Sequence, residues 1–456
     1  MEILRINGAR PLHGALRVHG AKNSVLPILA AALLCPGTVT VHNCPRLSDV
    51  SASAAILRRL GCRVERTGDT LTVDASAPTG SDIPDALMRE MRSSVIFLGA
   101  ILARMGEADM SYPGGCELGP RPIDMHLHAL RAMGAQVTER GGRLLCRAPC
   151  LTGCDLTLPL PSVGATENAM IAAVGARGTT TITNAAREPE IVDLQSFLCA
   201  MGARVRGAGT SVVTVEGGHP LHECEHTVIG DRIEAATYLA AAAAAGGEVE
   251  VRGADYRHLS TVTAALSEAG CEVHSAGESV TLRSPGRLHG IRPVHTAPYP
   301  GFPTDAQSPL MAAVCRGEGT SVFVEHVFSN RYRHVDELIR MGADIRVEGP
   351  VAVVSGRRAL HGAPVKCTDL RGGAALVVAA LSAEGTSEIS LLRHIDRGYE
   401  DLAGDLRTLG AEITREENEE REEEGPWQQD AARADGAAAA GEEDASASSI
   451  VCSPLS

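Results

Sequence analysis

The feature that most constrains the fold is a phrase of eight residues that recurs six times along the chain. Its form is Leu-x-x-(Leu/Met/Ala)-Gly-(Ala/Cys)-x-(Val/Ile). Spacing this regular is typical of a chain built from related units. Each glycine fits the end of a helix, with an apolar helix before it and a strand after it. The glycines are separated by 73, 68, 68, 72 and 68 residues: Gly61, Gly134, Gly202, Gly270, Gly342 and Gly410.

An Ala-rich helical stretch precedes each phrase and usually leads into a strand of the form Gly-Thr-x-x-(Val/Ile), as in residues 37–41 and 178–182. Each unit therefore reads helix, strand, helix, strand, strand. Solenoid repeats are usually shorter than these units of about 70 residues. We therefore predict an α/β fold with two globular groups of three units each.

The domain boundaries follow from the first stretch of the chain. Residues 3–18 contain strands but no helix of their own, so they would complete the sheet of the last group. The chain would cross between groups near Gly20 and return near Gly230, and two crossings place a ligand-binding cleft between the groups. The predicted domains are 1–20 plus 230–414, which is discontinuous, and an inserted domain, 21–229. Residues 415–456 hold 12 Asp or Glu and 3 Arg in a low-complexity run, which predicts a disordered acidic tail.

Composition excludes several classes of partner. The net charge is −14 and aromatic residues make up only 3%, so we predict no nucleic-acid binding. The N-terminus carries charges where a signal peptide needs an apolar core, and the longest apolar run, residues 235–245, is far below the roughly 20 residues that span a bilayer. Thirteen scattered cysteines indicate reduced thiols, and no Cys or His spacing indicates a metal site. We predict a cytoplasmic protein with no membrane segment, metal or cofactor.

The Ala-rich helices begin with polar or charged residues. Unpaired N–H groups and the helix dipole attract anions to such positions, so these starts predict a site for phosphate or carboxylate groups. The chain has only 2 Lys among its 42 basic residues, yet Lys22 stands at one start, and we interpret it as a ligand contact rather than a solvated charge. The starts are Lys22-Asn23, Arg92-Ser93, Ser162-Val-Gly164, Asp231-Arg232, Thr304-Asp305 and Asp369-Leu-Arg371.

Two further residues are candidates for acid–base chemistry. Cys116 lies among Gly and Pro, five residues from Arg121, in a loop that we expect to be exposed, as a reactive thiol requires. A bystander thiol is the alternative. Thr304-Asp-Ala-Gln307 reads as a capping box with Asp305 in the first turn, where a carboxylate stays ionised and can take a proton. Compensation of the helix dipole is the alternative there, and no Walker or dinucleotide-binding motif is present.

Several motifs, in order and in register from Met1 to about Arg415, carry a family resemblance. They are Gly20-Ala-Lys22-Asn23, Gly114-Gly-Cys116-Glu-Leu-Gly-Pro-Arg121-Pro-Ile-Asp124, Ser162-Val-Gly-Ala-Thr166, Pro300-Gly-Phe-Pro-Thr-Asp305, Asp369-Leu-Arg371 and His394-Ile-Asp-Arg397-Gly-Tyr-Glu400. With these motifs the chain resembles the UDP-N-acetylglucosamine enolpyruvyl transferases. The family's fold is two inside-out α/β barrels, each of three βαβαββ units, which agrees with the six repeats.

The resemblance implies a reaction. The enolpyruvyl group of phosphoenolpyruvate would move to the 3′-hydroxyl of UDP-N-acetylglucosamine, and phosphate would leave, by addition and elimination through a tetrahedral intermediate. In bacteria this is the first committed step of peptidoglycan synthesis, and so serves cell wall biogenesis, cell shape and cell division. The expected partners are therefore phosphoenolpyruvate and UDP-N-acetylglucosamine.

The resemblance also implies roles for individual residues. Cys116 takes the position of the general acid and of the covalent phosphoenolpyruvate adduct, while Asp305 lies beside the attacking hydroxyl. Lys22, Arg121 and Arg397 would hold phosphoenolpyruvate, with Arg92 nearby; for Arg397 a surface salt bridge is the alternative. Asp369 and Arg371 would be substrate contacts of less defined role. The nucleotide-sugar contacts would be Asn23, Arg121, Pro122, Ile123, Asp124, Met125, Ser162, Val163, Gly164, Asp305 and Val327, with main-chain N–H groups near Ser162 facing the diphosphate.

Two departures and three alternatives accompany this interpretation. Ser48 and Leu160 stand where some members carry lysines, which leaves substrate affinity less firmly predicted than reaction type. The related 3-phosphoshikimate 1-carboxyvinyltransferase shares the fold but does not use the Gly-Gly-Cys loop. A catalytically weak regulatory paralogue that binds UDP-N-acetylglucosamine is disfavoured by the intact candidate residues, and RNA-end cyclases are disfavoured by the acidic body of the chain.

Overall fold

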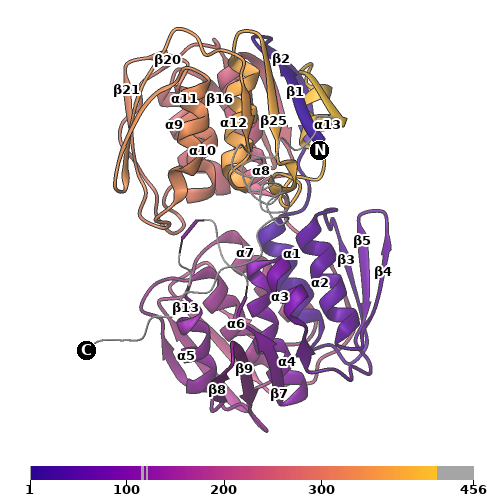
Figure 1. Cartoon of the computed structure of the whole chain (residues 1–456). Helices are drawn as coiled ribbons and strands as arrows, with labels where there is room; N and C mark the ends of the chain where they lie inside the picture. Colours follow the sequence, from indigo (N-terminus) through magenta and orange to yellow (C-terminus); the bar gives the residue numbers. More distant parts are fainter. Residues whose placement is uncertain (1, 114–117, 120–121, 418–456) are drawn as a thin grey trace, which may run out of the picture. The chain divides into compact units, whose positions relative to one another are not determined.

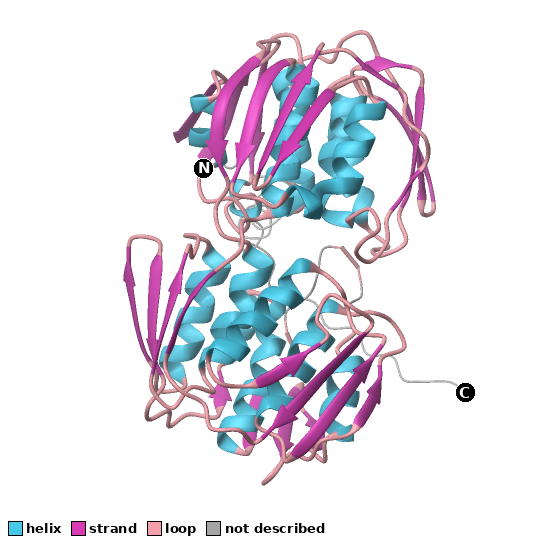
Figure 2. Ribbon diagram, turned by 180° about the vertical axis from the view of Figure 1, so that it is seen from behind, coloured by secondary structure: helices cyan, strands magenta, loops and turns pink. Residues whose placement is uncertain are grey.

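A computed structural model describes residues 2–113, 118–119 and 122–417 of the chain. Across these ranges the strands form six sheets of four strands each and one two-stranded pair. Figure 1 and Figure 2 show the helices gathered inside each of two groups, with the sheets around them. This arrangement places helices, rather than strands, at the centre of each group.

The third unit illustrates how the sequence produces the repeat. The Ala-rich α6 (Val163–Val174) follows β10 (Asp155–Thr157) and leads into β11 (Gly178–Thr183). The second helix, α7 (Pro189–Ala200), is followed by β12 (Arg204–Arg206) and β13 (Val212–Gly217). Strand β10 pairs in parallel with β11, and β13 pairs antiparallel with both β11 and β12. The predicted order of helix, strand, helix, strand, strand is therefore confirmed here, with one short strand in front that the pattern did not include.

The other two units of this group have the same plan. In the first, β14 (Cys224–Thr227), from the end of the group, pairs with β3 and so supplies the leading strand. The remaining elements of the first unit are α1 (Lys22–Ala32), β3 (Thr38–His42), α2 (Ser48–Arg59), β4 (Arg63–Thr67) and β5 (Thr70–Asp74). The second has β6 (Asp82–Ile83), α3 (Asp85–Glu90), the 3₁₀ turn η1 (Arg92–Ile96), α4 (Phe97–Met105), β7 (Glu107–Ser111), α5 (Asp124–Ala132), β8 (Gln136–Arg140) and β9 (Arg143–Arg147).

The second group repeats the plan three more times. Its first unit has β2 (Leu12–Arg17), α8 (Arg232–Ala245), β15 (Gly247–Arg252), the 3₁₀ turn η2 (Tyr256–Leu259), α9 (Ser260–Glu268), β16 (Glu272–Ala276) and β17 (Ser279–Ser284). Its second has β18 (Leu288–His289), β19 (Val294–His295), α10 (Thr304–Val314), β20 (Gly317–Glu318), β21 (Thr320–Val324), η3 (Arg331–His334), α11 (Val335–Arg340), β22 (Asp344–Glu348) and β23 (Val351–Ser355). Its third has β24 (Pro364–Lys366), α12 (Leu370–Ser382), β25 (Thr386–Ser390), η4 (Leu392–His394), α13 (Leu402–Thr408), β26 (Glu412–Glu417) and β1 (Glu2–Asn7).

The repeat glycines have the backbone conformation that explains their regularity. All six have φ between +92° and +103°, in the left-handed region that a side chain disfavours. Each follows the last turn of a helix and precedes a strand. The predicted helix-ending role of these glycines is therefore confirmed.

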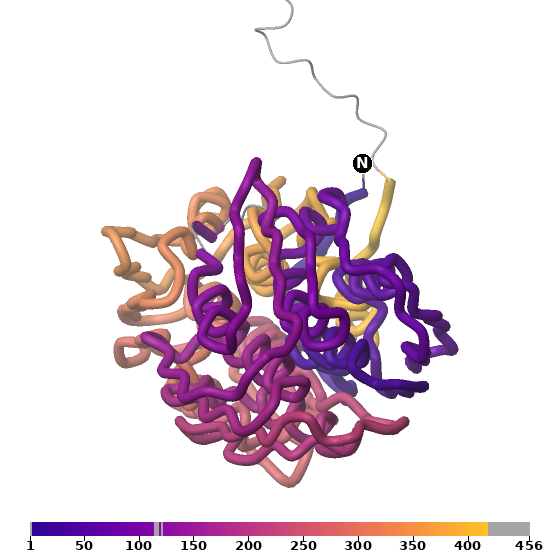
Figure 3. Tube along the Cα trace, turned by 90° about the horizontal axis from the view of Figure 1, so that it is seen from below, coloured from indigo at the N-terminus to yellow at the C-terminus, as the bar shows by residue number. Residues whose placement is uncertain are grey.

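The N-terminal strands contribute to two sheets of the second group. Strand β1 lies between β25 and β26, which is the predicted completion of the last sheet, whereas β2 pairs in parallel with β15 in another sheet. Figure 3 shows the first and last described segments of the chain side by side. Strand β26 runs to Glu417, so the first residues of the tail predicted from residue 415 belong to a strand. Arg415 holds that strand through two 2.9 Å hydrogen bonds to Asp396; the rest of the predicted tail lies outside the described residues.

The buried apolar residues fall into two clusters. One contains residues from Ala21 to Val228, and the other contains residues from Leu4 to Val18 and from Ala235 to Ile413. We propose that these clusters are the cores of the two predicted domains, 21–229 and 1–20 plus 230–414. All 14 residues of α8 are buried, as an alanine-rich helix that is apolar on every face permits. Helices α8, α10 and α12 pack against one another, and small alanine side chains allow this close packing.

The two crossings meet each other. Gly20 and Gly230, where we predict that the chain crosses between groups, form an isolated antiparallel bridge with each other. A Cβ atom on Gly20 would lie 1.8 Å from the carbonyl oxygen of Asn43, and one on Gly230 would lie 1.8 Å from that of Gly253. Glycine is therefore sterically required at both crossings. No helix within the described ranges is long and apolar enough to cross a membrane.

Candidate active site

The predicted helix starts coincide with the beginnings of helices. Lys22 and Thr304 are the first residues of α1 and α10, and Ser162, Asp231 and Asp369 directly precede α6, α8 and α12. Arg92 begins the 3₁₀ turn η1, which leads into α4. All six predicted helix starts therefore lie in first turns, where the backbone N–H groups have no partner within the helix itself.

Lys22 is held in place by the crossing between the groups. Its backbone N–H donates to Oδ2 of Asp231 at 3.1 Å. The other carboxylate oxygen of Asp231 accepts hydrogen bonds from the backbone of Ile233 and Glu234 in the first turn of α8. One carboxylate therefore connects the starts of α1 and α8 and fixes the direction in which the Lys22 side chain leaves the backbone.

The Lys22 side chain ends on a carboxylate that also holds Arg397. Lys22 Nζ lies 2.7 Å from Oδ2 of Asp49, in the first turn of α2. Arg397 donates to the same carboxylate through Nε, 3.1 Å from Oδ1, and through Nη2, 3.4 Å from Oδ2. Two of the cations predicted to hold phosphoenolpyruvate are thus brought together by Asp49, which the sequence analysis did not select. The surface salt bridge considered for Arg397 exists, but its acceptor is buried.

A second carboxylate, Asp305, also lies between two cations. Arg331 Nη2 donates to Oδ1 of Asp305 at 2.5 Å, and Arg371 Nη2 lies 3.4 Å from Oδ2. Arg331 also donates to the Thr304 hydroxyl at 3.0 Å. Both arginines are buried, whereas Asp305 is partly exposed. The exposed part of this cluster is therefore the carboxylate.

The environment of Asp305 sets its acidity. Burial by itself raises the pKa of this carboxyl, but Arg371 and Arg331 outweigh burial and hold the pKa well below its ordinary value. Asp305 is therefore ionised, as predicted, although a carboxylate this acidic is a weak base. The predicted capping box is wrong: Thr304 is the first helical residue, Pro303 precedes it, and no side chain caps the helix. The Thr304 hydroxyl instead donates to Glu325 at 3.0 Å.

Asp369 and Arg371 have local partners at the start of α12. Asp369 accepts hydrogen bonds from the backbone N–H groups of Arg371 at 3.1 Å and Gly372 at 3.0 Å, so it caps the helix. The guanidinium of Arg371 donates to the Tyr399 hydroxyl at 3.1 Å, and its centre lies 5.5 Å from the centre of the Tyr399 ring. These contacts orient Arg371 toward Asp305.

The residues predicted to contact the nucleotide sugar come together in two segments. Ser162 accepts from the backbone of Ala165 at 3.4 Å and so caps α6. A Cβ atom on Gly164 would lie 3.1 Å from the ring of His126, so α5 passes close to the start of α6. Ile123 is buried in the core, whereas Pro122 and Asp124 are exposed and Met125, Asn23 and Val163 are half-buried. Any contact from Ile123 would therefore be made by its backbone.

The loop that contains Cys116 is only partly described. Cys116 and Arg121 lie outside the described residues. Before the loop, Arg92 Nη1 donates to the carbonyl of Pro113 at 3.4 Å. Within it, the carbonyl of Leu118 accepts from the backbone N–H of Asn330 at 3.2 Å, and Gly119 packs closely on Ser329. Val327, in the same segment as Ser329, is exposed and donates from its backbone to Glu325 at 2.8 Å.

Sequence reasoning missed the partners of the predicted residues. Asp49 and Arg331, which it did not name, bind them directly, and Asp231, which it named only as a helix start, fixes the backbone of Lys22. The available signal for Asp49 was an acidic residue early in a helix, which also compensates the helix dipole and so is ambiguous. Ser48 and Leu160, the two predicted departures from the family pattern, are both exposed.

One group among the described residues brings three metal-ligand atoms close together: His19, Glu234 and Asp405. His19 Nδ1 lies 2.9 Å from Oε1 of Glu234. The Tyr238 hydroxyl lies 2.5 Å from Asp405 and 3.1 Å from Glu234. These groups satisfy one another by hydrogen bonds, and we assign no metal to them.

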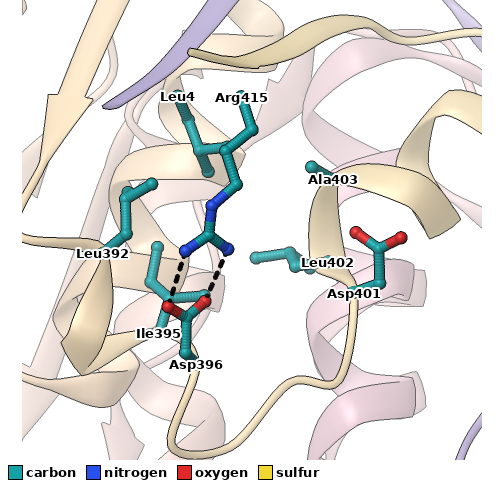
Figure 4. A pocket seen from close by; sticks show the side chains of 8 residues that line it. All are labelled: Leu4, Leu392, Ile395, Asp396, Asp401, Leu402, Ala403 and Arg415. Carbon is teal, nitrogen blue, oxygen red and sulfur yellow. Dashed lines mark hydrogen bonds and ion pairs between the residues drawn. The ribbon is translucent and has the colours of Figure 1, made fainter. Parts of the chain in front are cut away.

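A small cavity in the second group is separate from the candidate residues. Figure 4 shows its lining around the paired hydrogen bonds between Arg415 and Asp396. None of the predicted site residues lines it, so we interpret it as a packing feature beside β26. Its lining is Leu4, Leu392, Ile395, Asp396, Asp401, Leu402, Ala403 and Arg415.

Comparison with known families matches most of the chain. Residues 6–406 match the family described as EPSP synthase (3-phosphoshikimate 1-carboxyvinyltransferase). A protein named UDP-N-acetylglucosamine 1-carboxyvinyltransferase 2, from Caldanaerobacter subterraneus subsp. tengcongensis, is 49% identical over 90% of this chain and 99% of its own length. UDP-N-acetylglucosamine 1-carboxyvinyltransferase 1 of Symbiobacterium thermophilum is 51% identical over 90% of this chain and 94% of its own length.

Comparison with solved structures agrees with the fold. The enolpyruvyl transferase NikO from Streptomyces tendae covers 91% of this chain and 98% of its own, with a TM-score of 0.82 and 27% identity. EPSP synthase from Acinetobacter baumannii covers 91% of this chain and all of its own, with a TM-score of 0.70. That protein is 20% identical, and its similarity concerns the fold alone. The predicted fold of two inside-out α/β barrels is therefore confirmed.

Proposed function

This chain belongs to the EPSP synthase family, and from that membership we propose that it transfers the enolpyruvyl group of phosphoenolpyruvate to the 3′-hydroxyl of UDP-N-acetylglucosamine and releases phosphate. The observation that carries the choice of acceptor is the near-full-length identity of 49% and 51% to two UDP-N-acetylglucosamine 1-carboxyvinyltransferases. The chain is an enzyme of the 1-carboxyvinyltransferase class. The resemblance to UDP-N-acetylglucosamine enolpyruvyl transferases that its motifs indicated is therefore confirmed.

The cations support binding of phosphoenolpyruvate. The substrate carries a phosphate and a carboxylate, and both groups need positive partners. Lys22 and Arg397 share Asp49, and Arg371 lies against Asp305, so three of the cations selected from the sequence are held by carboxylates in defined positions. We assign the phosphate to Lys22 and Arg397, together with Arg121. Preplaced cations of this kind stabilise charge that develops in the transition state.

The position of Asp305 supports proton transfer from the hydroxyl of the acceptor sugar. We assign to Asp305 the contact with the sugar 3′-hydroxyl, because its carboxylate is the exposed member of its cluster. Arg371 and Arg331 keep this carboxyl ionised before the substrate binds, and we assign to it the removal of the 3′-hydroxyl proton in the complex with substrate. We assign to Cys116 the protonation of the methylene carbon and the covalent adduct with phosphoenolpyruvate.

The remaining contacts would hold the nucleotide. The backbone near Ser162, at the start of α6, supplies N–H groups for the diphosphate. Residues 122–125 and Val327 would surround the rest of the nucleotide sugar with Asn23. We further propose that the reaction takes place in the cytoplasm and supplies peptidoglycan synthesis, and through it cell wall biogenesis, cell shape and division.

Transfer to shikimate 3-phosphate is the alternative reaction within this family. It is disfavoured by the names of the near-full-length relatives and by the Gly-Gly-Cys loop. A weak regulatory paralogue is disfavoured because Lys22, Asp305 and Arg397 all have ordered partners.

The deciding experiment measures phosphate release from phosphoenolpyruvate with each acceptor in turn. We expect release with UDP-N-acetylglucosamine and none with shikimate 3-phosphate, and a strong reduction in Cys116→Ser. Release with shikimate 3-phosphate alone would overturn the choice of acceptor. If a folded protein that still binds the nucleotide sugar releases no phosphate with either acceptor, the result would favour the regulatory paralogue.

A further inference from the structure

Asp49 holds two cations that belong to different groups of the fold. Lys22 is in α1, close to Asp49 in α2, whereas Arg397 follows η4 and is 348 residues away in sequence. Both oxygens of the Asp49 carboxylate are used: Oδ1 accepts from Arg397, and Oδ2 faces both Lys22 and Arg397. Asp49 therefore occupies the position that an anionic ligand of these two cations would need.

The two contacts of Asp49 differ in exposure. The side chains of Asp49 and Lys22 are 4% and 10% exposed, whereas that of Arg397 is 40% exposed. A buried charge pair at 2.7 Å is expensive to separate, because each ion would stay in a poorly solvated position. A guanidinium that is already partly solvated can leave its partner at little cost. Arg397 is therefore the removable member of the cluster.

The buried position of Lys22 requires a nearby anion to keep its side chain charged. Burial lowers the pKa of Lys22, and Asp49 counteracts this effect. Arg397 also disfavours the charged form of Lys22, since the two cations repel each other. Without Asp49, buried Lys22 and partly exposed Arg397 would repel each other with no carboxylate between them. With Asp49 the three side chains carry a net charge of about +1.

We propose that Asp49 is an internal counter-anion, and that the phosphate group of phosphoenolpyruvate takes over Arg397 from it. This inference rests on the proposed function, because it assumes that Lys22 and Arg397 receive the phosphate. Asp49 is a positioning residue in this scheme: it keeps Lys22 charged and both cations in place before the substrate arrives. Its negative charge also weakens the binding of any free anion, so inorganic phosphate binds the site less tightly than it would without Asp49.

The test measures anion affinity in the full chain by titration calorimetry at pH 6, where a buried lysine is more readily kept protonated. The probes are sulfate, which stays doubly charged, and inorganic phosphate; neither can form an adduct with a thiol. We expect Asp49→Asn to bind both anions about tenfold more tightly than the wild type, because a repelling charge is removed at short range. In steady-state assays the KM for phosphoenolpyruvate should fall while kcat does not rise.

Two variants separate this role from a structural one. Asp49→Glu keeps the charge and should bind sulfate within about twofold of the wild type. Glu190→Gln removes another buried carboxylate that pairs with an arginine, Arg232 at 3.0 Å, and should leave sulfate affinity unchanged. A folded Asp49→Asn protein whose sulfate affinity is equal to or weaker than that of the wild type overturns the proposal.

A second measurement needs no substitution at Asp49. The Nε–H signal of Arg397, identified in a nitrogen-15 spectrum by its loss in Arg397→Lys, should shift when phosphate is added to the wild type. Phosphate that binds without moving this signal overturns the exchange of partners. If the wild type binds neither phosphate nor phosphoenolpyruvate, the proposed function fails as well. If it binds both with the Arg397 signal unmoved, the exchange at Asp49 and the contact of Arg397 with phosphate fail, while the proposed reaction stands.

Discussion

The two carboxylate clusters each join one aspartate to two cations, but they differ in which member is exposed. Asp49 lies between Lys22 and Arg397, and Asp305 lies between Arg331 and Arg371. In the Asp49 cluster the carboxylate is buried and one cation is exposed. In the Asp305 cluster both cations are buried, at 1% and 3% exposure, and the carboxylate is exposed at 26%.

The exposed member of each cluster determines which charge that cluster presents to a ligand. An exposed guanidinium suits an anion such as a phosphate, and an exposed carboxylate suits a hydroxyl that donates a hydrogen bond. The buried members hold the exposed one in place and set its charge. This division matches the two halves of the reaction, which needs a phosphate site and a site for an acceptor hydroxyl.

The largest expected effect is on catalysis at the exposed carboxylate. Asp305→Asn should lower kcat by about 10² to 10⁴, because the amide cannot accept the hydroxyl proton. The KM for UDP-N-acetylglucosamine should change much less. The measurement is phosphate release at saturating phosphoenolpyruvate. Equal losses of kcat in Asp305→Asn and Asp49→Asn would show that the two carboxylates do not differ in role.

The buried cations should matter more for stability than the exposed one. Arg331→Met leaves Asp305 with one partner and removes a guanidinium that also donates to Thr304, so we expect a loss of about 2 kcal/mol in the free energy of unfolding. Arg397→Met should cost less than about 1 kcal/mol, because its pair is partly solvated. Urea unfolding of both variants checks this, with the slope of each transition compared to the wild type. Similar losses in the two variants would remove the distinction between the clusters.

Most of the fold could be predicted from the sequence, because the signals for it are local. A glycine with φ near +95° follows the second helix of each unit, and this requirement left the same phrase in six places. The helix starts were found for a similar reason, since a polar residue before an apolar helix marks its own position. The repeat pattern did not include the leading strand of the third unit, because a strand as short as β10, with three residues, carries almost no alternation.

The site could be predicted only as separate residues. Lys22 and Asp305 stood out by residue type and place, but the pairing of Asp49 with Arg397 joins positions 348 residues apart. Nothing in the local sequence distinguishes such an aspartate from one that compensates a helix dipole. The capping box failed for a related reason: the hydroxyl of Thr304 is used by Glu325 and Arg331, which approach from a distant part of the chain.

A third cluster contains His19 and two carboxylates, Glu234 and Asp405, and it makes the stability of the fold depend on pH. The hydrogen bond that His19 donates to Glu234 raises the pKa of His19 to about 9, and burial raises the pKa values of Glu234 and Asp405. The folded protein thus holds protons here more firmly than the unfolded chain. The stabilisation is full below the unfolded His value, near pH 6.5, and is lost as pH rises through about 9.

We expect about 1 to 2 kcal/mol from this effect, since the His19 ring is one-third exposed. The unfolding free energy of the wild type, measured in urea between pH 6 and 9.5, should therefore fall as pH rises. His19→Gln should flatten this part of the profile while leaving the Asp49 and Asp305 clusters unaltered. A variant that keeps the wild-type slope would assign the proton release to other groups.

The smallest effect concerns Asp369, which lies 3.9 Å from Arg331 and also caps α12. Asp369→Ala removes both features and should cost about 1 kcal/mol, as the loss of a helix cap usually does. Asp369→Asn keeps a side-chain oxygen that can cap the helix but removes the charge, so it should cost only a few tenths of a kcal/mol. Thermal unfolding and phosphate release, measured on both variants, separate the two features. If Asp369→Asn is stable yet loses as much activity as Asp369→Ala, the charge of Asp369 acts on the Asp305 cluster through Arg331. If its activity stays near that of the wild type, the residue serves the Asp305 cluster only by holding the start of α12, and the charge of Asp369 does not contribute to the function of Asp305.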